Sequence, residues 1–217
     1  MTRTVAVVDY GMGNLRSVSQ AVLHVAAGTG FEVVVTSRPE EVRAAERVVL
    51  PGQGAMPDCM RELRESGLLP AVLEAAAGKP LMGVCIGMQM LLDRSEEGPT
   101  PGLALFPGRV KRFRHAGMID AGGERLKVPH MGWSPVHQTR AHPLWKGIEQ
   151  DARFYFAHSY HPVPDDAALT AATAAYPVAF TCAISRANIF ATQFHPEKSQ
   201  RAGLMLLANF TAWDGRG

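Results

Sequence analysis

The pattern that most constrains the fold is a regular alternation of strand-like and helix-like segments through the first half of the chain. Apolar, β-branched runs predict strands over residues 4–8, 31–36, 47–50 and 80–84. Helical patterns fall between and after them, over residues 15–26, 39–45, 57–77 with a break near Gly67 and Pro70, and 86–94. Strands that alternate with helices pair mostly in parallel, because each helix returns the chain across the sheet.

Beyond residue 95 the segments become shorter and turns become denser. Short strands are predicted over residues 109–113, 127–129, 154–158, 169–173 and 189–193, and an amphipathic helix over residues 202–213 closes the chain. Part of this half is expected to pair antiparallel. The sequence therefore predicts a single α/β domain over residues 1–217, with a mixed, mostly parallel sheet flanked by helices and an antiparallel C-terminal portion.

Composition and charge argue against several classes of function. The 217 residues are 47% hydrophobic and 19% charged, as in ordinary globular proteins, and the formal net charge is only +2. This balance gives no electrostatic reason to expect nucleic acid or an anionic membrane as the main partner. The longest apolar stretch, residues 81–92, is too short to span a bilayer, and the first residues do not form a secretory signal. We expect a cytoplasmic location.

The most informative segment for chemistry surrounds Cys85. A predicted strand runs into this cysteine, a predicted helix follows it, and Gly83 and Gly87 flank it two residues away on either side. Small neighbours let the chain turn sharply and lift a nucleophile clear of the sheet. The helix N-terminus favours a thiolate, and the Ile86 N–H is left free to stabilise an oxyanion. A buried structural cysteine would explain the same residue if the segment stood alone.

A cysteine nucleophile needs a base, and the base needs an acceptor that orients it. His195 and Glu197 lie two residues apart at the end of a predicted strand, so both side chains can project from its tip. Pro196 stiffens the link between them and has no N–H to compete. Taken alone, the tripeptide His195-Pro-Glu would be explained more simply as an exposed turn with ordinary polar residues.

Together these segments resemble the class I, triad-type glutamine amidotransferases. The resemblance rests on the sequence Gly83-Val-Cys-Ile-Gly-Met-Gln and on Gln193-Phe-His-Pro-Glu. Further blocks narrow it to the glutaminase subunits that serve imidazole glycerol phosphate synthases in histidine biosynthesis. These blocks begin at Val8-Asp-Tyr-Gly-Met-Gly-Asn, Leu50-Pro-Gly-Gln-Gly, Val128-Pro-His-Met-Gly-Trp, Phe154-Tyr-Phe-Ala-His-Ser-Tyr and His195-Pro-Glu-Lys-Ser. The fold that the resemblance implies is flavodoxin-like.

The resemblance also implies a role for individual residues. Cys85 would be the nucleophile, His195 the general base and acid, and Glu197 the residue that orients the imidazole. The backbone N–H groups of Gln53 and Ile86 would bind the oxyanion, and glutamine would be held by Gly52, Gln89, Ser159 and Tyr160. A (βα)₈-barrel cyclase that receives the ammonia would be contacted by Asn14, Met131, Trp133 and Lys198. No metal or cofactor is implied.

The chain departs from the family pattern in several places. Gln53 stands where the family usually has Val, Met56 where it often has Phe, and Ser134 where Asn commonly follows Gly-Trp. The loop over residues 26–30 is also longer than usual. These departures concern the turn that would bind the oxyanion and the expected contact with a partner, and they leave Cys85 and His195 unaffected.

Other interpretations have weaker support. The run Gly11-Met-Gly-Asn-Leu-Arg follows a strand like a dinucleotide fingerprint, but Arg16 replaces the third glycine. The three cysteines, Cys59, Cys85 and Cys182, have no paired spacing, and the histidines match no common metal site. A basic run over residues 111–115 fits a solvated strand face better than an anion site. The glutaminase of anthranilate or guanylate synthesis, and a non-catalytic binding subunit of the same fold, remain as alternatives.

Overall fold

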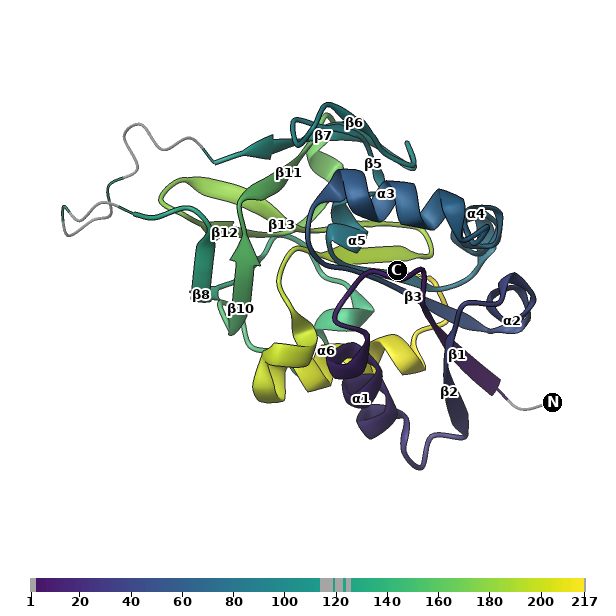
Figure 1. The fold of residues 1–217 in the computed structure, drawn as a ribbon. Coiled ribbons are helices and arrows are strands. Elements are labelled where there is room, and N and C mark those ends of the chain that lie inside the picture. The colour runs from purple at the N-terminus through teal and green to yellow at the C-terminus, as the bar shows by residue number, and fades with distance from the viewer. Residues whose placement is uncertain (1–2, 114–118, 120–122, 124–125, 217) are drawn as a thin grey trace.

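The computed structural model describes residues 3–113, 119, 123 and 126–216. An eight-stranded sheet forms its centre (Figure 1). Five strands of this sheet run parallel in the order β2 (Phe31–Thr36), β1 (Arg3–Val8), β3 (Arg47–Gly52), β4 (Leu81–Cys85) and β14 (Ile189–Thr192). This is the flavodoxin-like order, in which the carboxyl ends of neighbouring strands open toward a ligand site. The sheet continues antiparallel through β13 (Ala179–Arg186), β12 (Thr170–Ala175) and β9 (His137–Gln138). The predicted fold class is confirmed.

Helices cover both faces of the parallel part of the sheet. On one face α1 (Leu15–Ala26) packs against α6 (Gln200–Ala212), and on the other lie α3 (Met56–Glu65) and α4 (Leu69–Gly78), with α2 (Pro39–Ala44) in contact with α4 (Figure 1). In α1 the buried positions Val18, Ala21 and Val22 recur at the spacing of one helical face, which explains why this segment docks on the sheet. The predicted break between α3 and α4 falls at residues 66–68.

The helix predicted over residues 86–94 is wrong, because α5 (Ile86–Gln89) is a single turn and the chain then enters β5 (Leu92–Ser95). The helix ends early because of contacts with a later segment of the chain. This segment takes the backbone acceptors that a longer helix would need: Leu103 N–H donates to the Met90 carbonyl at 2.7 Å, and Phe106 N–H donates to the Leu91 carbonyl at 2.9 Å. The strand β5 is part of a second sheet in the order β11 (Tyr160–Pro164), β7 (Phe106–Arg112), β5, β6 (Thr100–Pro101).

The strand predicted over residues 127–129 is also misplaced, since β8 (His130–Pro135) begins at His130 and pairs with β10 (Arg153–His158). Sequence patterns missed five strands altogether: β5, β6, β9, β11 and the eight-residue β13. The other predicted elements lie within a few residues of their expected limits. In the basic run, Lys111 and Arg112 belong to β7, whereas Arg114 and His115 lie outside the described residues.

Aromatic packing joins the central sheet to the two-stranded β8–β10 unit. The ring centroids of Phe154 on β10 and of Phe194, which follows β14, are 4.3 Å apart. Both side chains are fully buried. Interlocked rings of this kind have little freedom to shift, because protein cores pack as densely as organic crystals. The backbone of β10 is therefore held against the carboxyl end of β14. Among the described residues, no helix is long and apolar enough to cross a membrane.

Candidate active site

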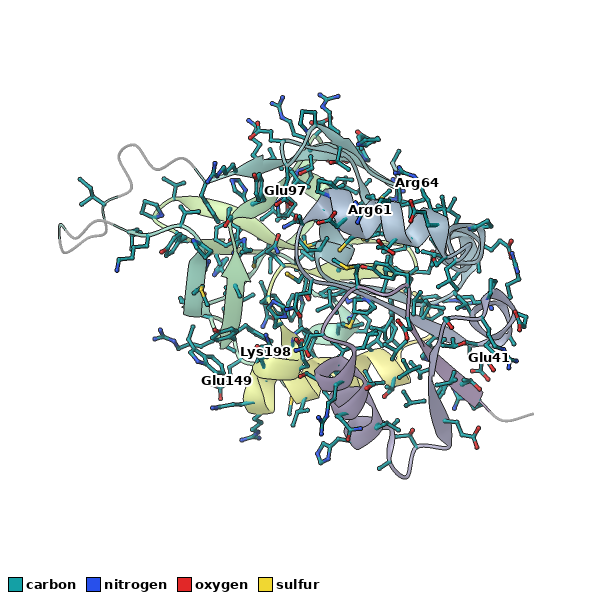
Figure 2. All side chains as sticks on the ribbon, viewed as in Figure 1. Glu41, Arg61, Arg64, Glu97, Glu149 and Lys198 are labelled. Atoms are coloured by element: carbon teal, nitrogen blue, oxygen red, sulfur yellow. The ribbon has the colours of Figure 1, made fainter. Side chains whose placement is uncertain are left out.

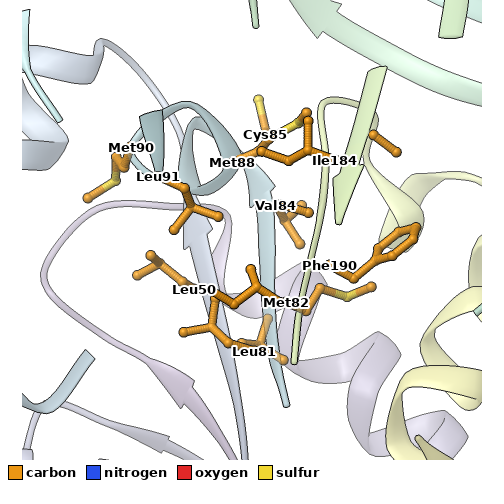
Figure 3. Packing of buried hydrophobic residues seen from close by; sticks show 14 of the residues in the cluster. Leu50, Leu81, Met82, Val84, Cys85, Met88, Met90, Leu91, Ile184 and Phe190 are labelled. Carbon is orange, nitrogen blue, oxygen red and sulfur yellow. The ribbon is translucent and has the colours of Figure 1, made fainter. Parts of the chain in front are cut away.

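Cys85 occupies a strained turn at the carboxyl end of β4. Its backbone has φ 57° and ψ −112°, a conformation that costs a residue with a side chain about 1–3 kcal/mol. Figure 3 shows Cys85 above Val84, Met82 and Leu81, whose side chains are buried in the core beneath it. The side chain thus stands at the edge of the sheet, and surrounding packing holds the strained turn in place. The sequence prediction of a sharp turn is confirmed in its geometry.

Three glycines make this turn possible. A Cβ on Gly87 would lie 2.0 Å from the Leu50 carbonyl oxygen, a Cβ on Gly83 would lie 2.9 Å from the Gly87 carbonyl oxygen, and a Cβ on Gly52 would lie 2.6 Å from the Gly87 nitrogen. Real Cβ contacts below 3.0 Å with backbone atoms essentially do not occur. The first turn of α5 therefore rests directly on β3, and this contact fixes where Cys85 sits.

His195 and Glu197 lie beside this turn as a hydrogen-bonded pair. His195 comes just after β14, which pairs in parallel with β4, and Glu197 lies in the short 3₁₀ helix η3 (Pro196–Lys198). His195 Nδ1 is 2.8 Å from Glu197 Oε1, and both side chains are at most 5% exposed. Because Glu197 takes Nδ1, the nitrogen left to face Cys85 is Nε2. The backbone of His195 is fixed as well, since its N–H donates to the Tyr155 carbonyl and its carbonyl accepts from the Ser199 hydroxyl.

The surroundings of His195 favour its charged form. Burial by itself lowers the pKa of this imidazole, but hydrogen bonds and charge interactions with Cys85 and Glu197 outweigh burial and raise the pKa to about 10. An imidazolium beside a sulfur stabilises the thiolate, which is the nucleophilic form of cysteine. The arrangement can therefore support attack by Cys85 and then proton donation by His195.

A cavity of about 230 Å³ opens over Cys85. It is smaller than typical sites for drug-sized ligands and suits a molecule the size of an amino acid. Most of the predicted site residues line it: Gln53, Cys85, Ile86, Gln89, Met131, Ser159, Tyr160, His195 and Lys198. The lining also includes residues that were not among the predicted site residues: Gly54, Glu97, Pro129, Ala157 and His158. The fold thus brings Cys85, His195 and the predicted substrate contacts Gln89, Ser159 and Tyr160 to one cavity from three separate parts of the chain, whereas Gly52 and Glu197 do not line it.

Buried amides connect the cavity wall to Cys85. Gln89 Nε2 donates to the Tyr160 carbonyl at 3.2 Å and to Gln193 Oε1 at 3.0 Å, while Gln193 Nε2 lies 3.7 Å from Cys85 Sγ. The remaining atom of the Gln89 amide, Oε1, is buried without a hydrogen-bond partner among the described residues. A buried acceptor left open at a cavity wall is suited to a donor group on a ligand. The sequence analysis assigned no role to Gln193. Its position two residues before His195 is the signal that could have identified it, because residues two apart on a strand point to the same face.

The turn expected to supply an oxyanion donor follows directly on β3, whose register with β4 is unbroken from Val48 to Gly52. Gln53 and Gly54 line the cavity, and Gly54 has a positive φ of 94°. The flanking carbonyls are held: Tyr10 donates its hydroxyl proton to Pro51 O at 2.7 Å, and Cys59 Sγ lies 3.4 Å from Gln53 O.

Of the four residues predicted to meet a partner, Met131 and Lys198 line the cavity, whereas Asn14 and Trp133 do not. Met131 is 64% exposed and Trp133 37% exposed on β8, and Met131 also lines the cavity. Lys198 extends from η3 beside β10, with its ammonium 5.9 Å from the centre of the Tyr155 ring (Figure 2). Asn14 precedes α1. Its neighbour Gly13 lies close to Pro51, since a Cβ added at Gly13 would be 3.4 Å from the Pro51 side chain.

The described residues contain no group of three or more histidine, cysteine or carboxylate side chains that could hold a metal ion. Cys59 and Cys182 are buried free thiols, and burial raises the pKa of both. Several histidines have other hydrogen-bond partners. His142 accepts the Leu144 N–H, His137 pairs with Asp151, and His130 contacts His158.

Comparison with known proteins identifies related sequences and folds. Residues 6–212 match the family model described as glutamine amidotransferase class-I. The chain is 60% identical over 209 residues to the imidazole glycerol phosphate synthase subunit HisH of Nitrosospira multiformis, covering 96% of this chain and 97% of that one. It is 61% identical to the HisH subunit of Aromatoleum aromaticum, covering 96% and 98%. A putative GMP synthase subunit from Thermoplasma acidophilum has the same fold, with a TM-score of 0.71 at 18% identity, covering 98% of this chain and 94% of that one.

The contact between α5 and β3 can be tested by adding one methyl group. Gly87→Ala is expected to lower the free energy of unfolding by about 3 kcal/mol or more, because the methyl group would overlap the Leu50 carbonyl. Gly78→Ala is the control, since nothing lies within 4 Å of its Cβ, and it should stay within about 1 kcal/mol of the parent. Urea unfolding followed by circular dichroism measures both. Equal midpoints for the two variants would contradict the close approach.

Proposed function

Because the chain belongs to the class I glutamine amidotransferase family, we propose that it is the glutaminase subunit of an imidazole glycerol phosphate synthase. In this proposal it is a single amidotransferase domain that works in the cytoplasm without a cofactor. It hydrolyses glutamine to glutamate and ammonia, and the ammonia passes to a (βα)₈-barrel cyclase. The observation that carries the proposal is the small cavity lined by Cys85, Gln89 and His195, with Glu197 hydrogen-bonded to His195.

The reaction follows from the arrangement of these groups. The Cys85 thiolate attacks the carboxamide carbon of glutamine, and the carbonyl π electrons move onto oxygen. His195 Nε2 then gives its proton to the departing nitrogen, so that the C–N bond breaks, ammonia leaves and a glutamyl thioester remains. Water attacks the thioester as His195 takes its proton, and glutamate leaves while Cys85 returns to the thiolate. Glu197 holds the imidazole through Nδ1 during both steps.

The cavity wall also suits the backbone groups of glutamine. Gln89 Oε1 would accept a hydrogen bond from the α-ammonium group, because this oxygen has no other partner among the described residues. The backbone at Ser159 and Tyr160 borders the same space, and Gly52 lies against Gly87 and Ile86 under the nucleophile. The exposed residues Met131, Trp133 and Lys198 beside the cavity would contact the cyclase, so that ammonia is released next to the interface.

Replacing the nucleophile should separate the two activities of the complex. Cys85→Ala is expected to abolish glutaminase activity, while the complex with the cyclase still forms its product from added ammonium salt. Cys182→Ala is the control, because this thiol is buried on β13 and does not line the cavity, and its glutamine turnover should remain close to that of the parent. Glutamate release and cyclase product are measured in parallel. Loss of both activities in Cys85→Ala would contradict separate sites.

The His195–Glu197 pair predicts a graded loss. His195→Ala should be nearly as damaging as Cys85→Ala, because groups that act as a unit do not contribute additively. Glu197→Gln keeps an acceptor for His195 Nδ1 but removes the charge that stabilises the imidazolium, so intermediate glutaminase activity is expected. Steady-state glutamate release measures both variants. Parental turnover in both would rule out His195 as the base.

Glutamine hydrolysis should be slow in the isolated chain and fast in the complex. Gly52 and Gly54 flank Gln53 and give this turn the freedom to change conformation, so that only one state need present the Gln53 N–H to the oxyanion. A missing oxyanion donor costs about a hundredfold or more in rate. Glutamate release is compared for the chain alone, with the cyclase, and with the cyclase and its ligand. A rate that neither addition changes would refute this coupling and favour a free-standing hydrolase.

A further inference from the structure

Two buried histidines link the exposed strand β8 to the wall of the cavity. The Ser134 hydroxyl lies 2.9 Å from His130 Nε2, His130 Nδ1 lies 3.0 Å from His158 Nε2, and His158 Nδ1 lies 2.7 Å from the Tyr160 carbonyl oxygen. His130 is 2% exposed and His158 is 5% exposed. Neither imidazole has a part in the chemistry of Cys85 or His195. A buried ring nitrogen of one imidazole faces a ring nitrogen of the other, so one of the two must donate a proton and the other accept it.

The direction of every hydrogen bond in this chain follows from its last acceptor. A carbonyl oxygen can only accept, so His158 Nδ1 must carry a proton. In neutral His158 the nitrogen Nε2 is then an acceptor, which requires the proton of His130 to be on Nδ1. His130 Nε2 becomes an acceptor in turn, and Ser134 donates its hydroxyl proton to it. The Tyr160 carbonyl thus sets the tautomer of both rings.

The surroundings keep both rings neutral and fixed. Burial lowers the pKa of His130 to about 4 and that of His158 to about 3. The His130 ring stacks between Tyr176 and Phe156, with centroid distances of 4.0 and 4.8 Å, and Phe113 packs against His158 at 5.2 Å. Hydrogen bonds held in such an apolar setting are strong, and breaking one leaves a buried group unsatisfied.

The chain of hydrogen bonds continues into the substrate site. The Tyr160 carbonyl that accepts from His158 also accepts from Gln89 Nε2, which in turn reaches Gln193 and, through it, Cys85 Sγ. Because this carbonyl receives two donors, its orientation determines where the Gln89 amide is held. Gln89 lines the cavity, and its Oε1 is buried without a hydrogen-bond partner among the described residues.

We propose that His130 and His158 are positioning residues: they form a relay of fixed direction that runs from Ser134 to the Tyr160 carbonyl and thereby aims the Gln89 acceptor at the substrate. The relay acts on the binding of glutamine rather than on attack by Cys85. Its role as a substrate-positioning device rests on the proposed glutaminase function, whereas the tautomers of the two rings can be observed without any activity.

Two substitutions at His158 separate the relay from simple packing. His158→Asn retains an N–H near the position of Nδ1, so it can still donate to the Tyr160 carbonyl, although it loses the Nε2 acceptor for His130. His158→Leu fills more of the apolar space but has no donor. A packing role therefore predicts that Leu is the better replacement, whereas the relay predicts that Asn is. His142→Leu serves as the control, because His142 is a half-buried ring that packs on Phe190 and Trp213 away from the cavity.

Substrate binding is measured on the full chain by alkylation of Cys85 with an analogue of L-glutamine whose carboxamide is replaced by a chloromethyl ketone. Labelling is followed by mass spectrometry over a range of concentrations. His158→Leu is expected to raise the half-saturating concentration about tenfold or more, with the limiting rate within about threefold of the parent. His158→Asn keeps the last donor of the relay but not its bond to His130, so its half-saturating concentration should lie between those of the parent and His158→Leu. His142→Leu should stay within about threefold of the parent in both values. A folded His158→Leu with parental half-saturation, or a His158→Asn equally impaired, would overturn the relay.

Nitrogen-15 spectra of the imidazoles provide a test that depends on neither folding of a variant nor activity. At neutral pH the parent chain should show protonated Nδ1 and unprotonated Nε2 in both His130 and His158. The opposite tautomer or a charged ring at His158 would refute the relay. Failure of the parent Cys85 to react with the chloromethyl ketone, with these tautomers present, would instead count against the proposed function.

Discussion

The contact of Gly87 with the Leu50 carbonyl is the constraint on which the site depends. With only hydrogen on Gly87, the first turn of α5 can rest on the backbone of β3, and the chain between β4 and α5 must turn within one residue. Cys85 takes that position, with a positive φ that the packing of Gly52, Gly83 and Gly87 imposes. The strained backbone therefore reflects how closely two parallel strands and a helix approach one another.

Around this point the fold assembles groups from layers that are distant in sequence. The parallel strand β14 carries the chain to His195 and Glu197, while β10 and β11 carry it past Ser159 and Tyr160. Phe154 and Phe194 lock these layers together, and the His195 N–H is bonded to the Tyr155 carbonyl. Because His195 and the cavity wall share these contacts, neither can move far without the other.

The region that we propose as the partner surface adjoins the cavity directly. Met131 is both exposed and part of the cavity wall, and Lys198 follows Glu197 by one residue. Ser134, three residues after Met131 on β8, begins the chain of imidazoles that ends at the Tyr160 carbonyl. Gln53 lines the same cavity, and the carbonyls of Pro51 and Gln53 are both held by hydrogen bonds. A contact at the surface therefore has short physical routes to the substrate wall and the nucleophile.

The sequence by itself determined the parallel half of the sheet, its helices and the neighbourhood of the nucleophile. These features depend on local patterns: apolar runs that end in polar turns, glycines two residues on either side of Cys85, and the His195–Glu197 spacing. Only the tertiary structure decided that residues after Gln89 form β5 and that β13 extends the central sheet beyond β14. It also decided that His130 and His158 meet across strands β8 and β10. Such features depend on which distant segments form hydrogen bonds with a backbone group or contact a side chain, and local sequence patterns do not contain that information.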